Sequence, residues 1–205
     1  MTLDRELMQT IIKRYPRSRS AIMPLLHYVQ SVSGYVTNEG IETISEILEI
    51  ETAEVSAVAT FYTQYKRKPV GEYHVGVCTN TLCAVMGGDA IFSALKEHLG
   101  IDNDGVTEDG KVSLEHIECN AACDYAPVVM ANWEFYDNQT VESAKSLVDG
   151  ARAGNPPAPT RGPNKLVTYK QASAVLAGLD DGLAREGVQA GEPTLLGLKL
   201  SKEGK

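Results

Sequence analysis

The sequence predicts an α+β protein, in which an N-terminal helical bundle precedes a small α/β domain and an extended C-terminal tail. Three changes along the chain support this prediction. Apolar residues recur at helical spacing over residues 1–68, segments of alternating polarity follow over residues 69–150, and residues 151–205 are rich in proline, glycine and polar side chains. A chain of 205 residues is long enough for two such domains.

Four helices are expected in residues 1–68, beginning near residues 3, 18, 37 and 52. Pro16 and Gly34 end the first and the second of them. Thr37 and Thr52 are suitable N-caps for the third and the fourth, because a threonine hydroxyl can accept a hydrogen bond from the first turn. Each helix is apolar on one face only, so we expect these faces to pack on one another or on the next domain.

The α/β domain is expected to alternate strands and helices. Residues 73–78 and 112–118 alternate as strands do, and residues 88–99 between them have helical spacing. A short buried strand over 127–132, a second over 133–136 and a helix capped by Thr140 complete the domain. This order predicts a small α/β sheet of the size found in thioredoxin-like proteins.

The tail has few strong signals. Residues 155–163 have the composition of an extended linker, residues 170–179 can form one helix, and residues 183–205 are glycine-rich and polar. Scattered apolar side chains in this tail suggest that it lies on a partner protein, and a disordered tail is the alternative.

Composition and charge restrict the class of partner. The net charge of −8 argues against nucleic acid or an anionic membrane as the main partner. No run of about 18 apolar residues is present, so we expect no direct membrane insertion. The first residues resemble neither a signal peptide nor a transit peptide, and a reducing cytosol is the expected compartment.

All four cysteines fall into two close pairs, Cys78 with Cys83 and Cys119 with Cys123. Four residues separate the first pair, three separate the second, and thirty-five lie between the pairs. Each pair follows the end of an expected strand. Because the ends of parallel strands in a β-α-β unit meet at one edge of the sheet, we expect the pairs to converge into one four-thiolate site.

Both a [2Fe–2S] cluster and a structural zinc ion can be held by four thiolates. The spacing favours the cluster, because neither pair has the two-residue gap of zinc ribbons and a four-residue gap suits ligands divided between two irons. Zinc, disulfides and unliganded thiols remain alternatives. The absence of a C-x-x-C motif argues against thioredoxin-type dithiol exchange.

Several other motifs are absent or weak. No G-x-G-x-x-G or P-loop motif is present, so we expect the chain itself to bind neither NADH nor ATP. The acidic segment 102–110 lacks the spacing of a calcium loop and is interpreted as a solvated turn. None of the histidines pairs with another ligand at metal spacing, and no catalytic triad is expected.

Four segments together resemble the E subunit of the proton-translocating NADH:quinone oxidoreductases of bacteria, the family of respiratory complex I. The resemblance covers about residues 10–150. The segments are SAIMPLLH at 20–27, VATFY at 58–62, PVGEYHVGVCTNTLC at 69–83 and ECNAACDYAP at 118–127.

This resemblance implies a thioredoxin-like domain in which Cys78, Cys83, Cys119 and Cys123 ligate the irons of one [2Fe–2S] cluster. It implies an oxidoreductase subunit that is not catalytic alone and that exchanges electrons with FMN. FMN and NADH are then bound by a neighbouring subunit, and the large iron–sulfur subunit is a second partner. The expected location is peripheral, at the cytoplasmic face of the inner membrane. Related domains occur in NAD-linked hydrogenases and formate dehydrogenases, and a zinc-stapled assembly module is the alternative function.

One residue departs from the family pattern. Members often have glycine where this chain has Ala121. If that position requires a positive φ, alanine is strained there by roughly 1 kcal/mol. All four cysteines are nevertheless present.

Overall fold

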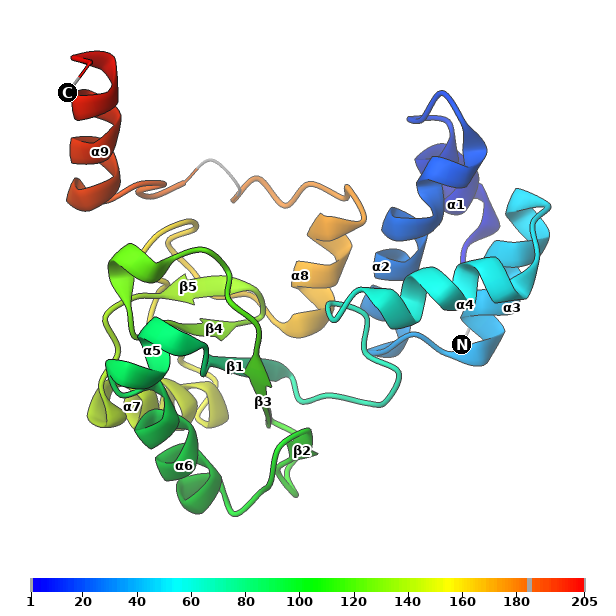
Figure 1. The fold of residues 1–205 in the computed structure, drawn as a ribbon. Helices are drawn as coiled ribbons and strands as arrows, with labels where there is room; N and C mark the ends of the chain where they lie inside the picture. Colours follow the sequence, from blue (N-terminus) through cyan, green and yellow to red (C-terminus); the bar gives the residue numbers. More distant parts are fainter. Residues whose placement is uncertain (1, 184–185, 205) are drawn as a thin grey trace. The chain divides into compact units, whose positions relative to one another are not determined.

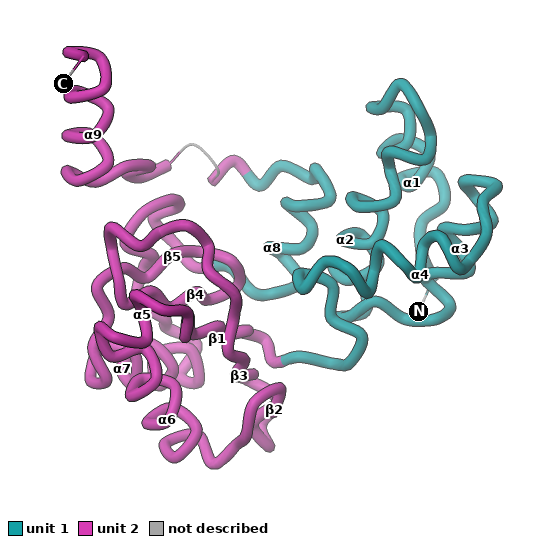
Figure 2. Tube along the Cα trace, in the orientation of Figure 1, with its two compact units in different colours: residues 1–70, 167–181 teal, residues 71–166, 182–205 magenta. Residues whose placement is uncertain are grey.

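The computed structural model describes residues 2–183 and 186–204 (Figure 1). The chain divides into two compact units, coloured separately in Figure 2. Residues 1–70 and 167–181 make up the first unit, and residues 71–166 and 182–205 make up the second. The units therefore differ from the expected division 1–68, 69–150 and 151–205 chiefly in the C-terminal segment, which they share.

The first unit is helical. It contains α1 (Arg5–Ile12), a 3-10 turn (Ser18–Ala21), α2 (Ile22–Ser33), α3 (Asn38–Leu48), α4 (Thr52–Phe61) and α8 (Tyr169–Leu176). Thr37 caps α3 as expected, because its hydroxyl accepts a hydrogen bond of 3.0 Å from the Gly40 N–H. In α4 the N-cap position belongs to Glu51, and Thr52 is the first helical residue.

Buried aliphatic side chains from α1 to α4 form the core of the first unit, with Leu25, Leu26 and Ile44 fully buried. Helix α8 packs on α2 and contributes the buried residues Tyr169 and Ser173. The helices thus bury their apolar faces against one another, as the one-sided patterns predict.

A five-stranded sheet in the order β2-β3-β1-β4-β5 forms the centre of the second unit. Its strands are β1 (Tyr73–Cys78), β2 (Gly105–Val106), β3 (Val112–Ile117), β4 (Val129–Ala131) and β5 (Glu134–Tyr136). Strand β1 runs parallel to β3 and antiparallel to β4. The expected thioredoxin-like α/β fold is confirmed for this domain.

Two helices, α6 (Gly88–Leu99) and α7 (Val141–Arg152), pack on each other and on the sheet. They share one core with alternate residues of β1 and β3, including Val75, Val77 and Leu114. Because strand side chains alternate between faces, Cys78 belongs to the other face of the sheet. Thr140 caps α7 with a complete capping box, as its position predicts.

The expected extended tail needs correction. Residues 151–205 contain the helices α8 and α9 (Glu192–Lys202), and only α8 lies near its expected position. The segment around Thr160 and Arg161, expected as an extended linker, is bound to β5. That the tail lies on a partner subunit stays a prediction.

Two short elements were also not predicted. Helix α5 (Thr81–Val85) carries Cys83, and β2 lies within the segment interpreted as a solvated turn. Among the residues that the structure describes, no helix combines the length and apolar character needed to cross a membrane.

Candidate metal centre

The four cysteines follow the parallel strands β1 and β3. Cys78 is the last residue of β1, and its register partner Ile117 is the last residue of β3. Cys119 therefore lies just beyond the same sheet edge that Cys78 marks, and Cys83 follows in α5. The parallel strands β1 and β3 thus provide the backbone geometry that the expected convergence of the two cysteine pairs requires.

All four thiols are free, and they differ in exposure. Cys78 and Cys83 are buried, whereas Cys119 and Cys123 are exposed. The Sγ atoms of Cys119 and Cys123 lie 3.6 Å apart. Cys78 and Cys83 are close enough for their thiols to hydrogen-bond, so the four side chains form two pairs.

The thiols influence one another's protonation. The pKa of Cys83 is raised to about 11, chiefly by burial. The backbone N–H of Val128 opposes this rise, and the neighbouring thiols of Cys78 and Cys123 add to it. The pKa of Cys123 is raised chiefly by its hydrogen bond to Cys119. Four thiolates so close together repel, and bound metal cations would relieve that repulsion because they deprotonate their thiol ligands outright.

Besides the Val128 N–H at Cys83, two further N–H groups reach sulfur atoms. The Ala121 backbone N–H donates to Cys119 Sγ over 3.3 Å, and the Asn80 side-chain amide lies 3.9 Å from Cys78 Sγ. The same Asn80 amide donates to the Ile117 carbonyl over 3.1 Å, which ties the ends of β1 and β3 together. Hydrogen bonds to ligand sulfurs orient the ligands and adjust the potential of an iron–sulfur centre.

Backbone conformation shapes both ligand loops. Ala121 has φ 55, so the positive φ that alanine disfavours is present at this position. Gly88, at the start of α6, lies against both first-pair cysteines. A Cβ atom there would be 2.4 Å from the Cys78 carbonyl oxygen and 2.8 Å from that of Cys83. Glycine at position 88 thus allows α6 to begin in close contact with the backbone of both cysteines.

A small apolar cluster supports the cysteines from the side. Buried Cys78 and Cys83 pack with Ile117, Tyr125 and Met130, among others. Tyr125 belongs to the 3-10 turn Cys123–Tyr125, which precedes a cis peptide bond between Ala126 and Pro127. Neither Asn80 nor Tyr125 was predicted as a site residue. Asn80 occupies the N-cap position of α5 without a side-chain capping hydrogen bond, and this helix is too short to be predicted, so no local signal marked Asn80.

The four histidines lie elsewhere. His74 bonds to Ser113 and Glu115, and His98 bonds to Asp149. No three His, Cys, Asp or Glu side chains between residues 2–183 and 186–204 have the grouping that a single metal ion needs. A cluster with two irons divides four ligands into two pairs, and the thiols of this chain are arranged in two pairs.

Comparison with known proteins agrees with this chemistry. Residues 8–152 match the family described as thioredoxin-like [2Fe–2S] ferredoxin. The E subunit of NADH-quinone oxidoreductase from Mycobacterium tuberculosis (strain ATCC 25618 / H37Rv) is 60% identical over 194 residues, covering 94% of this chain and 77% of the relative. The subunit of the same name from Rickettsia bellii (strain RML369-C) is 43% identical over 149 residues, covering 71% of this chain and 89% of the relative.

A solved structure is similar at the level of the fold. An NAD+-reducing [NiFe]-hydrogenase, crystallised in the air-oxidized state, superimposes with a TM-score of 0.58 at 18% identity. The matched region covers 66% of this chain and 23% of the hydrogenase chain. From the family match and the identity to its relatives, this chain belongs to the thioredoxin-like [2Fe–2S] ferredoxins and is a homologue of the E subunit of NADH-quinone oxidoreductase.

Proposed function

We propose that this chain is the electron-transfer subunit of the NADH-oxidising module of an NADH:quinone oxidoreductase. In this proposal Cys78, Cys83, Cys119 and Cys123 hold one [2Fe–2S] cluster, for single-electron exchange with FMN in a neighbouring subunit. The observation that carries the proposal is the arrangement of four free thiols as two pairs at one sheet edge. The family and the identity to the NADH-quinone oxidoreductase relatives support it.

A bound [2Fe–2S] cluster supplies a centre that takes up and releases one electron at a time. The residues of this chain determine where that centre lies and how it is screened. Cys78 and Cys83 are the buried ligands, and Cys119 and Cys123 are the exposed ones, so the exposed pair is the side open to an electron partner. The Ala121 and Asn80 N–H groups stabilise negative charge on the ligand sulfurs.

The partners follow from the same proposal. The relatives are named as parts of NADH-quinone oxidoreductase, so we infer contact with the subunit that binds FMN and NADH and with the large iron–sulfur subunit. The location inferred is peripheral, at the cytoplasmic face of the inner membrane. The 60% identity favours the respiratory complex over the equivalent subunit of an NAD-linked hydrogenase or formate dehydrogenase.

The test is to reconstitute the full chain anaerobically with iron and sulfide and to record its metal content and low-temperature EPR spectrum. We expect two iron atoms per chain and a rhombic signal that appears only after reduction with dithionite. Single Cys→Ser variants at all four positions are expected to lose the wild-type signal. A colourless chain that binds one zinc instead would support the structural assembly module and contradict the proposal.

Exchange with the flavin subunit needs a separate experiment on the assembled complex. In the wild-type complex, NADH is expected to reduce the [2Fe–2S] cluster as fast as it reduces the flavin, which is seen as the appearance of the cluster's EPR signal. A complex in which NADH reduces the flavin and leaves this centre oxidised would contradict the exchange, while the cluster assignment would stand.

A further inference from the structure

The segment after α7 is attached to the sheet next to the cysteine loop. Thr160 N–H donates to the Phe135 carbonyl over 2.9 Å, and Phe135 and Arg161 form an antiparallel bridge. Tyr136 in β5 donates its hydroxyl hydrogen to the Pro157 carbonyl over 2.7 Å. Residues 157–161 therefore lie along β5, in the part of the chain where the sequence predicts an extended linker.

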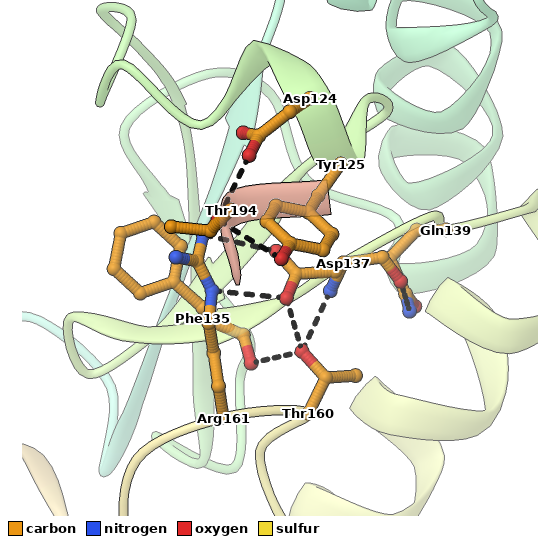
Figure 3. Close-up of polar contacts among 8 residues, drawn as sticks. All are labelled: Asp124, Tyr125, Phe135, Asp137, Gln139, Thr160, Arg161 and Thr194. Carbon is orange, nitrogen blue, oxygen red and sulfur yellow. Dashed lines mark hydrogen bonds and ion pairs between the residues drawn. The ribbon is translucent and has the colours of Figure 1, made fainter. Parts of the chain in front are cut away.

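Arg161 makes the strongest polar contact of this segment. Its Nε and Nη2 atoms donate to the two carboxylate oxygens of Asp137 over 3.0 and 3.2 Å (Figure 3). The Asp137 side chain is only 7% exposed, so this is a two-point ion pair largely removed from water. The Thr160 hydroxyl accepts the Asp137 backbone N–H over 3.0 Å and lies 2.8 Å from the carboxylate.

The guanidinium group also lies against two aromatic rings. Its central carbon is 4.0 Å from the ring centroid of Phe135 and 4.8 Å from that of Tyr125 (Figure 3). Because the ion pair with Asp137 fixes the plane of the guanidinium, Arg161 presents a fixed face to both rings.

Tyr125 connects this contact to a cysteine. It is the last residue of the turn that begins with Cys123, and its N–H donates to the Ala122 carbonyl over 3.0 Å. Its carbonyl accepts the Asn138 N–H over 2.8 Å, and its hydroxyl lies 3.1 Å from the hydroxyl of Thr194. Tyr125 is also part of the cluster around buried Cys78 and Cys83.

We infer that Arg161 is a positioning residue for the cysteine loop, acting through Tyr125 on Cys123 and on the packing around Cys83. The inference rests on the proposed function, since the loop is proposed to ligate the cluster. It assigns a role to a segment outside the family match, which ends at residue 152.

The test compares the wild-type full chain with Arg161→Ala, Arg161→Lys and a neutral pair, Arg161→Gln with Asp137→Asn. The neutral pair guards against misfolding, because Arg161→Ala leaves the Asp137 carboxylate buried without its cation. Arg152→Ala is the matched control, since Arg152 also pairs with an aspartate in the second unit, Asp109, at 2.9 Å, and its side chain is more exposed.

Two readouts are needed. In the reconstituted chain, Arg161→Ala and the neutral pair are expected to lose iron to a chelator about tenfold faster and to show shifted g-values in EPR, since altered support of metal ligands typically has an effect of this size. In the reduced metal-free chain, alkylation of buried Cys83 is expected to accelerate about tenfold, a ratio that corresponds to about 1.4 kcal/mol. Arg161→Lys keeps the charge and is expected to recover part of both effects.

The outcomes separate the two proposals. Wild-type rates and g-values in both Arg161→Ala and the neutral pair would overturn the positioning role. A lowered unfolding temperature with unchanged g-values and alkylation rates would also overturn it, because it would leave Arg161 a purely structural role. If the wild-type chain binds no [2Fe–2S] cluster, the proposed function fails, and the alkylation of the metal-free chain still decides whether Arg161 holds the loop.

Discussion

Ala121 illustrates how one residue can store strain next to a proposed ligand. Its φ of 55 lies in the left-handed region, and its N–H donates to Cys119 Sγ over 3.3 Å. A non-glycine residue in this region costs of the order of 1 kcal/mol. The strained conformation and the N–H···S hydrogen bond thus occur at the same residue.

Ala121→Gly is therefore expected to stabilise the metal-free chain by about 0.5–1 kcal/mol, because glycine relieves the backbone strain. The greater conformational entropy of glycine in the unfolded chain offsets part of that gain. Urea unfolding followed by the fluorescence of Trp133, the single tryptophan, measures this. Ala122→Gly is the matched control. Ala122 is buried with φ −104, so its replacement is expected to destabilise the chain. Equal effects of the two replacements would contradict the account.

His27 gives the first unit a pH dependence. It is 5% exposed, its Nδ1 has no hydrogen-bond partner, and burial lowers its pKa to about 4. In the unfolded chain its pKa is about 6.5. Between these values only the unfolded state binds the proton, so the contribution of His27 to stability is complete above pH 6.5 and is lost as the pH falls towards 4.

The expected loss from this one group is about 2 kcal/mol between pH 8 and pH 5. His27→Phe keeps a ring against Tyr65, whose ring centroid lies 4.7 Å away, and removes the titration. From pH 8 to pH 5, the free energy of unfolding should therefore fall by about 2 kcal/mol less in His27→Phe than in the wild-type chain. Parallel pH profiles for the two chains would show that His27 has no part in the dependence.

At the scale of elements, the start of α6 fixes the distance between this helix and the two segments that carry Cys78 and Cys83, the end of β1 and α5. Gly88 is buried, and a Cβ atom there would overlap the carbonyl oxygens of Cys78 and Cys83. Backbone atoms cannot rotate away as a side chain does. The helix and the loops must therefore separate if any larger residue is introduced.

We expect Gly88→Ala to destabilise the chain by about 1–3 kcal/mol, the usual cost of overpacking. The displaced loops should also lose iron about tenfold faster after reconstitution. Gly197→Ala in α9 is the control, since a Cβ atom there has no neighbour within 4 Å. Wild-type iron retention in Gly88→Ala would mean that the loops tolerate the shift.

The elements that could be predicted are those whose local pattern is repeated over several residues. Strand β1 and helix α6 begin and end where alternation and helical spacing predict, and the parallel pairing of β1 and β3 places Cys78 and Cys119 at the same end of the sheet. Helix α5 has five residues, too few to show a period, so the sequence predicts only a loop around Cys83. In α9 the exposed leucines do not share one face, and no residue of this helix is buried.

At the scale of the whole molecule, the chain returns to its first unit after completing most of its second. Helix α8 packs on α2, and the amide of Gln30 lies 3.4 Å from the hydroxyl of Ser173. Gln30 is fully buried and also bonds to the backbone at Gln64 and Lys66. No local signal predicts such a pairing, because it joins segments separated by 143 positions. The contact of Arg161 with Tyr125 escapes prediction for the same reason.

This return predicts that the stability of the N-terminal helices depends on a residue near the C-terminus. Tyr169 in α8 is 1% exposed, so Tyr169→Ala should cost the first unit about 3–5 kcal/mol through lost burial and a cavity. Leu176→Ala is the matched control on the same helix. Leu176 is 41% exposed, and its replacement should change stability by about 0.5 kcal/mol or less.

Two probes separate the units in this experiment. Far-UV circular dichroism reports on the helices of both units, of which α1 to α4 and α8 belong to the first, whereas Trp133 fluorescence reports on the second unit alone. Tyr169→Ala is expected to shift the part of the helical transition that comes from the first unit to lower urea, and to leave the tryptophan transition in place. If neither transition moves, α8 contributes nothing to the core of the first unit. If both move together, the units unfold as one, and the C-terminal segment that they share couples the helical unit to the stability of the cysteine site.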